Sequence, residues 1–269
     1  MIKIDSIGEQ LMYNTLKLET ATGTGTGFIF EFSIEDKKVP VIITNKHVVN
    51  YKENEEVNFS VHIADKNGEP TESCNVRCFS KWFFHPTYDL CCTPLIPIIQ
   101  QLNESLNKNM FYKTLEEANI LTNLESEELN TQEDVTMIGY PRGLWDDYNK
   151  LPIFRKGYTA FHPGIDFNNE SLGLVDMACF PGSSGSPIFL YSEGVYSNKK
   201  GNAFIGKRCK LMGVLFSGPT IQTTGQVVDL QTLKFISVSE NMINLGYYIK
   251  AREILYFKNI FETMIKNEK

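Results

Sequence analysis

The most informative stretch of the sequence is Phe180-Pro181-Gly182-Ser183-Ser184-Gly185-Ser186-Pro187. Serines flanked by glycines and prolines predict a tight turn that exposes a hydroxyl group and directs backbone N–H groups at the space beside it. Acyl transfer needs both features, because the hydroxyl can act as a nucleophile and the N–H groups can stabilise the negative charge that develops on a carbonyl oxygen. A turn of this composition is more often an ordinary loop, so the interpretation depends on two segments that precede it.

Those two segments supply a histidine and an aspartate. A β-branched run at residues 41–44 leads to His47, and a turn after Phe84 leads to Asp89 at the start of an apolar stretch. A serine hydroxyl is a poor nucleophile at neutral pH, so it needs a base within hydrogen-bond reach and a carboxylate that orients this base. The order His47, Asp89, Ser184 therefore predicts a catalytic triad. The remaining histidines, His62, His85 and His162, are interpreted as surface or turn residues.

Six motifs resemble those of the chymotrypsin-fold (trypsin-like) serine proteases, and their pattern is most similar to the bacterial HtrA/Deg-type protease domain. In sequence order they are Gly25-Thr26-Gly27-Phe28-Ile29, Thr44-Asn45-Lys46-His47-Val48-Val49, Tyr88-Asp89-Leu90, Ile138-Gly139-Tyr140-Pro141-Arg142-Gly143-Leu144, residues 176–187 and Leu211-Met212-Gly213-Val214. The resemblance extends from about residue 15 to about residue 240. It implies an all-β fold of two six-stranded β-barrels packed face to face, with the active site between them and a helix at the C-terminal end.

The resemblance also assigns roles to individual residues. It makes His47 the general base, Asp89 the carboxylate that orients it, and Ser184 the nucleophile, selected over Ser183 and Ser186 by its Gly-x-Ser-Gly frame. The backbone N–H groups of Gly182 and Ser184 would form the oxyanion hole. The primary specificity pocket would be lined by Ala178, Cys179, Phe216, Ser217 and Gly218. None of these is acidic, which disfavours cleavage after Arg or Lys and predicts a small-to-medium apolar P1 side chain.

Three positions depart from the family pattern. Cys91 and Cys92 stand where small aliphatic residues usually follow the aspartate. Ser183 stands where secreted trypsin-like enzymes carry an aspartate that pairs with a new N-terminal amine after zymogen cleavage. Because Ser183 has no charge to offer, we expect that activity needs no N-terminal cleavage, and an activating protein partner remains open.

Short runs of β-branched and aromatic residues, separated by clusters of Gly, Asn, Asp and Pro, independently predict an all-β fold. They lie at residues 15–19, 27–32, 39–44, 57–63, 76–84, 135–139, 153–161, 172–178, 187–190 and 210–217. We expect one peptidase domain over residues 1–269, with the first barrel at about 1–100 and the second at 132–247. Residues 101–131 form an acidic inter-barrel connection with one or two short helices, and residues 248–269 form an amphipathic C-terminal helix.

Composition narrows the function further. The chain has 269 residues, of which 42% are hydrophobic, and this suffices for a sizeable core. A net charge of −6 without a basic block argues against nucleic acid as a partner. No apolar stretch is long enough to span a membrane. The N-terminus lacks a signal peptide's apolar core, so the six cysteines are interpreted as reduced thiols in a bacterial cytoplasm. No metal or organic cofactor is implied.

The leading functional hypothesis is a serine endopeptidase that acts on protein or peptide substrates in a regulatory, stress or defence role. Two alternatives remain open. One is a latent or non-catalytic binding module with a protease fold that acts through residues 101–131, and the other is a viral processing protease. An esterase of the α/β-hydrolase fold is disfavoured, because that fold places its residues in the order Ser, Asp, His.

Overall fold

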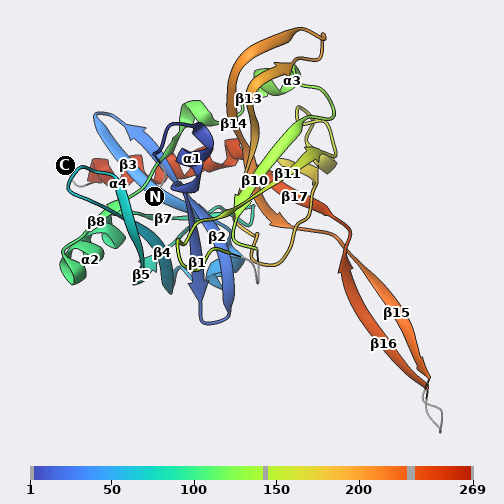
Figure 1. The fold of residues 1–269 in the computed structure, drawn as a ribbon, viewed down its shortest axis with the longest axis horizontal. Helices are drawn as coiled ribbons and strands as arrows, with labels where there is room; N and C mark the ends of the chain where they lie inside the picture. Colours follow the sequence, from blue (N-terminus) through green and yellow to red (C-terminus); the bar gives the residue numbers. More distant parts are fainter. Residues whose placement is uncertain (1–2, 142–144, 229–233, 268–269) are drawn as a thin grey trace.

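The computed structural model describes residues 3–141, 145–228 and 234–267, which form two β-structures side by side (Figure 1). The N-terminal half is a nine-stranded sheet in which seven strands follow the order β5-β4-β1-β2-β3-β7-β6, while β8 pairs with β4 and β9 with β2. The C-terminal half is a closed six-stranded barrel with the order β10-β11-β12-β17-β14-β13. Residues 142–144 of the fourth motif and residues 268–269 of the expected C-terminal helix lie outside the described residues.

The N-terminal sheet begins after a short helix, α1 (Ile7–Met12), whose N-terminus is capped by Ser6. Its strands alternate buried and exposed side chains where one face meets solvent, as in β5. The strands are β1 (Thr15–Thr20), β2 (Gly23–Ile34), β3 (Lys37–Thr44), β4 (Asn54–Ala64), β5 (Pro70–Lys81), β6 (Phe83–Phe84), β7 (Cys91–Pro94), β8 (Asn109–Phe111) and β9 (Leu115–Glu116).

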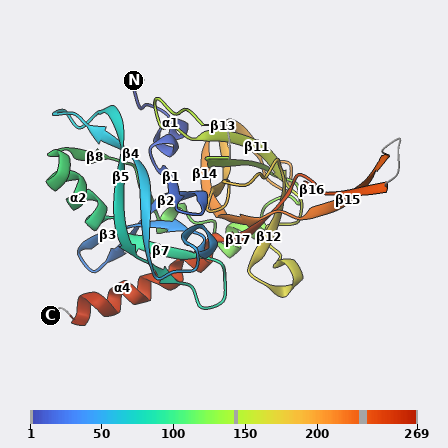
Figure 2. The same ribbon diagram turned by 90° about the horizontal axis from the view of Figure 1, so that it is seen from below.

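The barrel strands are joined by antiparallel pairing throughout. They are β10 (Asp134–Gly139), β11 (Ile153–Thr159), β12 (Leu172–Asp176), β13 (Pro187–Ser197), β14 (Ala203–Ser217) and β17 (Leu245–Lys250). Between β14 and β17 the chain forms a two-stranded hairpin, β15 (Thr220–Val228) and β16 (Lys234–Met242), that projects far beyond the barrel (Figures 1 and 2).

The remaining elements are short helices. The N-terminal half contains the 3-10 turn η1 (Lys46–Val49) and the helix α2 (Ile96–Leu106), while η2 (Glu117–Asn119) and α3 (Asn123–Glu127) lie in the connection between the halves. The 3-10 turn η3 (Phe167–Asn169) precedes β12. The chain ends with η4 (Ala251–Leu255) and α4 (Tyr256–Asn267).

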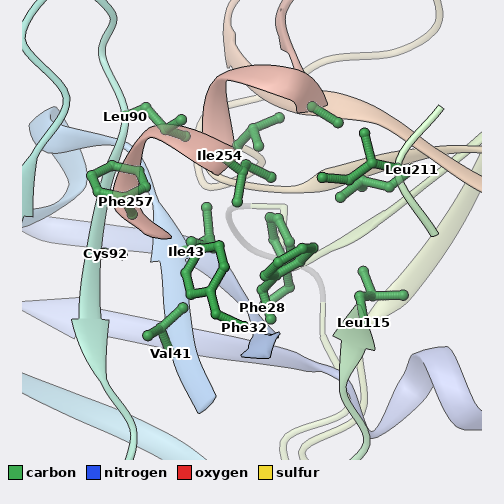
Figure 3. Packing of buried hydrophobic residues seen from close by; sticks show 14 of the residues in the cluster. Phe28, Phe32, Val41, Ile43, Leu90, Cys92, Leu115, Leu211, Ile254 and Phe257 are labelled. Atoms are coloured by element: carbon green, nitrogen blue, oxygen red, sulfur yellow. The ribbon is translucent and has the colours of Figure 1, made fainter. Parts of the chain in front are cut away.

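A shared hydrophobic cluster holds the two halves together (Figure 3). It combines side chains of β2 and β3, such as Phe28 and Ile43, with Leu211 of β14 in the barrel. Helix α4 follows the last barrel strand but packs against the N-terminal sheet, where the rings of Phe32 and Phe261 lie 6.0 Å apart. The C-terminal segment therefore contacts both halves, since it continues from the barrel and packs on the N-terminal sheet.

The all-β class, the two-part architecture and the C-terminal helix are confirmed, and the structure corrects three details. The N-terminal sheet has nine strands rather than six, and among the described residues its pairing leaves β5 and β6 as open ends. Residues 109–116, expected in the inter-barrel connection, supply β8 and β9, because Met110, Phe111 and Leu115 are buried there against the rest of the N-terminal half. Residues 248–250, expected in the helix, end β17, where Tyr248 fills the barrel interior.

Candidate active site

His47 and Asp89 are brought together by the pairing of two strands. Strand β3 ends at Thr44, which pairs with Cys91 at the start of β7, so the residues just beyond these ends become neighbours. His47 lies in η1, directly after β3, and Asp89 lies two residues before β7. The imidazole Nδ1 of His47 is 2.5 Å from the Asp89 carboxylate oxygen Oδ2.

The position of Asp89 is fixed from two further directions. The backbone N–H of His47 donates to the second carboxylate oxygen, Oδ1, at 3.1 Å. The side-chain amide of Asn45 donates to the Asp89 carbonyl at 2.7 Å. A carboxylate held in this way favours a proton on Nδ1 of His47, and this leaves Nε2 as the nitrogen that can accept one. Both side chains are partly exposed, so the pair is accessible to a substrate.

Ser184 lies in the loop between β12 and β13, and this loop packs directly on the N-terminal sheet. Gly185 adopts a left-handed conformation with φ +84°, and a Cβ there would clash with the backbone oxygen of Thr26 and the hydroxyl of Thr44. Only glycine fits such a position. Since Thr44 precedes His47 by three residues, this close approach brings the serine loop to the end of β3, where the histidine lies.

Thr26, on β2, joins the serine loop to both halves of the molecule. Its backbone N–H donates to the Ser184 carbonyl at 2.9 Å, and its hydroxyl donates to the Gly182 carbonyl at 3.0 Å. The same hydroxyl accepts from the backbone N–H of Tyr140 in the barrel at 3.0 Å, and the Thr26 carbonyl accepts from the Thr44 hydroxyl at 2.7 Å. Sequence reasoning noted Thr26 only as part of a glycine-rich motif and missed this role.

Of the three neighbouring serines, only Ser184 is accessible. Ser183 and Ser186 are buried, with 1% and 0% of their surface exposed, whereas Ser184 is partly exposed. Within the described chain the hydroxyls of Ser183 and Ser186 have no hydrogen-bond partner. Neither does a hydrogen bond between Ser184 and His47 occur among the described residues. Such a bond is often long in a free enzyme and shortens when substrate binds.

The candidate oxyanion hole consists of backbone N–H groups that the protein leaves open. Gly182 has φ +91°, a left-handed conformation that turns the peptide before Ser183. Hydrogen bonds hold the carbonyls of Gly182 and Ser184 against Thr26. Over the described ranges, the N–H groups of Gly182 and Ser184 have no acceptor within the protein. Both donors are therefore available to a ligand oxygen.

The residues expected to line the specificity pocket form one neighbourhood. A Cβ added at Gly218 would lie 3.7 Å from the Cβ of Cys179, so Cys179 lies beside the end of β14. Cys179, expected in the pocket lining, is only 2% exposed and packs in the barrel core, where burial raises the pKa of its thiol to about 11 and keeps it neutral at physiological pH. Ala178 and Phe216 are half-buried, and Ser217 is exposed.

Arg155, on β11, is a contributor that sequence reasoning missed. Its guanidinium donates to the Ala178 carbonyl at 2.5 Å and lies 4.8 Å from the centre of the Phe180 ring. These contacts hold the backbone at Ala178 and the ring of Phe180 at the start of the serine loop. They also place a positive charge beside the pocket. The only sequence signal is the inward position of Arg155 in the alternating pattern of β11.

All six cysteines are free thiols. No group of three or more His, Cys, Asp or Glu side chains that could hold a metal ion occurs within residues 3–141, 145–228 and 234–267. No helix in that part of the chain is both long enough and apolar enough to cross a membrane. Two of the histidines interpreted as surface or turn residues, His62 and His85, are in fact buried, with 2% and 5% exposed.

Comparison with known proteins identifies the family. Residues 25–196 match the model of the trypsin-like peptidase domain. A comparison with curated proteins finds no match. Among solved structures, the Rv3671c protease of M. tuberculosis in an inactive form has a TM-score of 0.45 and 15% identity, over 90% of this chain and 86% of that chain. The thermostable serine protease AL20 from an extremophilic microorganism has a TM-score of 0.47 and 12% identity, over 94% and 99%. A Glu endopeptidase in complex with MPD has a TM-score of 0.46 and 15% identity, over 94% and 91%.

The fold and the site thus define a serine protease, a hydrolase whose substrates are proteins or peptides. Because the family model covers more than half of the sequence, the chain belongs to the trypsin-like peptidases.

Proposed function

We propose that His47, Asp89 and Ser184 form the catalytic triad of an endopeptidase. The observation that carries the proposal is the 2.5 Å contact between His47 and Asp89, located where the glycine turn around Ser184 packs against β2 and the end of β3. A histidine oriented by a carboxylate, next to the one accessible serine of its loop, is the arrangement that activates a hydroxyl for acyl transfer.

In the proposed mechanism, Nε2 of His47 accepts the hydroxyl proton of Ser184 while Oγ bonds to the scissile carbonyl carbon. The resulting oxyanion accepts hydrogen bonds from the N–H groups of Gly182 and Ser184. His47 then gives the proton to the leaving amine, and an acyl-enzyme forms. Water, with its proton taken by His47, attacks the ester and releases Ser184. In a comparable site, one oxyanion donor contributes about 2.7–4 kcal/mol of transition-state stabilisation.

We infer a small-to-medium apolar P1 preference from the pocket walls. The half-buried Ala178 and Phe216 provide apolar surface, and the buried Cys179 thiol behind them is neutral. The guanidinium of Arg155, which donates to the Ala178 carbonyl, adds a second argument against a basic P1 side chain, because like charges repel in a partly buried pocket. We also infer that activity needs no N-terminal cleavage, since the buried Ser183 has no charge with which to bind a new amine.

For the cellular setting we propose a cytoplasmic enzyme with a regulatory, stress or defence role. The alternative of a latent binding module through residues 101–131 makes a different prediction, because such a protein would not turn over substrate.

Hydrolysis of casein, with cleavage sites mapped by mass spectrometry, tests the proposed function. We expect cleavage after small or medium apolar residues that Ser184→Ala and His47→Ala both abolish. Ser183→Ala, which changes a buried hydroxyl next to the nucleophile, is the matched control and should retain activity. Activity that survives Ser184→Ala, or an inactive but well-folded wild type, would contradict the proposal.

A further inference from the structure

The substrate-facing edge of β14 loses its strand partner just beyond the serine loop. One edge of β14 pairs with β17, and the other pairs with β13 only as far as Val214, opposite Pro187. Leu215 then exchanges backbone hydrogen bonds with the serine loop, through Gly185 N–H and Ser186 carbonyl, at 2.8 and 2.9 Å. From Phe216 onward, no described strand pairs with this edge. The open edge therefore begins beside Ser184.

The projecting hairpin extends this open edge. Only Gly218 and Pro219 separate β14 from β15, and only Ile243 and Asn244 separate β16 from β17. The β15–β16 ladder therefore continues the β14–β17 ladder, with β15 following β14 and β16 following β17. One edge of β15 is paired with β16, just as the corresponding edge of β14 is paired with β17. The other edge of β15 is unpaired and continues the unpaired edge of β14, rotated by the twist of the two-stranded ribbon.

The residues of β15 do not protect this edge against pairing. Natural edge strands are commonly blocked by charged residues or proline. The nine residues of β15, TIQTTGQVV, include neither, whereas β16 carries Lys234 and Glu240. Ile221 and Thr224 are exposed, and both views show the hairpin extending away from every other element (Figures 1 and 2). A two-stranded hairpin is marginally stable alone, so a third strand would stabilise it.

We propose that the outer edge of β15 binds an extended segment of the polypeptide substrate, the segment that precedes the scissile bond. A peptide that pairs with Phe216–Gly218 has its reacting carbonyl at the Leu215 end, near Ser184, and its remote residues toward β15. Antiparallel pairing, which every strand pair of this barrel uses, makes the remote residues the N-terminal ones. Main-chain hydrogen bonds would give affinity with little sequence preference.

This inference rests on the proposed function, so its test uses binding rather than turnover. A casein peptide with a mapped cleavage site is made in two lengths. The short peptide begins about four residues before the cleaved bond, and the long peptide begins about twelve residues before it. Because an extended chain advances about 3.3 Å per residue, only the long peptide reaches the middle of β15. Fluorescence anisotropy measures the binding of each peptide to the Ser184→Ala protein. A second form of this protein has residues 221–241 replaced by Asn-Gly, which joins the paired residues Thr220 and Met242.

We expect the long peptide to bind the intact protein roughly tenfold more tightly than the short one. The shortened hairpin should remove this difference and leave the affinity for the short peptide unchanged. A peptide extended at its C-terminal side should gain nothing. Equal binding of the two lengths to the intact protein, or a length effect that survives the shortened hairpin, would overturn the inference. Failure of the proposed function would instead appear earlier, as well-folded wild-type protein that cleaves casein at no site.

A matched pair of point variants keeps the test valid if the shortened protein does not fold. Thr224 on β15 and Val238 on β16 are paired and both exposed. Thr224→Lys places a charge on the strand that would bind substrate and should weaken binding of the long peptide severalfold, whereas Val238→Lys should not. Equal effects would contradict the inference. A dimer that dissociates when the hairpin is shortened, with no length effect, would show that the hairpin binds a second copy instead.

Discussion

The two halves of the active site are held by different kinds of contact. In the N-terminal half, side chains do the positioning, since the His47 imidazole, the Asp89 carboxylate and the Asn45 amide bind one another or nearby backbone. In the C-terminal half, backbone contacts position the serine loop: Gly185 forms the turn, and a backbone hydrogen bond holds Ser184 against Thr26. Polar substitutions in the first half should therefore alter chemistry and spare the fold, whereas changes in the second half should alter both.

The largest effect on activity is expected for Asp89→Asn. The new amide would face Nδ1 of His47 and favour the wrong tautomer, and the same change in a comparable triad lowers kcat about 10⁴-fold. The melting temperature should change little, because the carboxamide oxygen can still accept from the backbone N–H of His47. Steady-state kinetics and thermal unfolding measure the two quantities. A large loss of stability would contradict the separation between the two halves.

In the serine loop we expect Gly185→Ala to affect stability and activity together. The added methyl group clashes with the Thr26 backbone, and the residue keeps a positive φ, so unfolding should become easier by about 2–5 kcal/mol. Urea denaturation measures this loss. Gly68→Ala is the matched control, since Gly68 has φ +81° but open space around it and isolates the cost of the backbone conformation. Equal losses for both variants would show that the contact with β2 is unimportant.

Thr26 forms hydrogen bonds with both halves of the molecule. Thr26→Val should therefore lower both the stability of the fold and the activity. The valine leaves the Tyr140 N–H and the Gly182 carbonyl without their hydroxyl partner, and each buried orphan costs about 1–3 kcal/mol. We expect a lower unfolding free energy and a reduced kcat. Thr26→Ser keeps the hydroxyl and should restore both, so a serine variant as impaired as the valine variant would argue for lost packing instead.

A substitution of Arg155 tests whether its hydrogen bond to the Ala178 carbonyl is needed to position the serine loop. Arg155→Met removes the hydrogen bond to the Ala178 carbonyl while keeping a long side chain. We expect kcat/KM to fall by about 10- to 100-fold, because small displacements in a catalytic loop have effects of this size. Lys156→Met changes the next residue, which is exposed and pairs only with Asp134 in the described structure, and should be neutral. If both variants match the wild type, Arg155 does not position the loop.

The smallest effect concerns pH and lies in the N-terminal half. Burial lowers the pKa of His62 from 6.5 to about 4, so the unfolded chain takes up a proton that the folded chain excludes. The contribution of His62 to the free energy of unfolding is therefore greatest above pH 6.5 and decreases as the pH falls toward 4. His62→Phe should flatten the dependence of melting temperature on pH between 6.5 and 4. An unchanged slope would show that His62 does not contribute.

Sequence reasoning predicted a triad because triad chemistry requires particular residue types in a particular order, and the structure places two of these residues, His47 and Asp89, 2.5 Å apart. It could not find Thr26 or Arg155, because their roles depend on strands that meet only in the folded chain. Burial of His62 was likewise hidden, since a histidine in a β-branched strand can face either side. Sequence reasoning did not predict the hairpin β15–β16, whose two strands pair with each other in a sheet separate from the barrel.

Reaction with a fluorophosphonate, followed by peptide mapping, tests the central claim most directly, because the probe modifies a serine only when an oriented histidine activates it. We predict a single adduct on Ser184 that is lost in His47→Ala and strongly reduced in Asp89→Asn, with Ser183 and Ser186 unmodified. An adduct on another serine, or the absence of any adduct on well-folded protein, would contradict the assignment of His47, Asp89 and Ser184 as the catalytic triad.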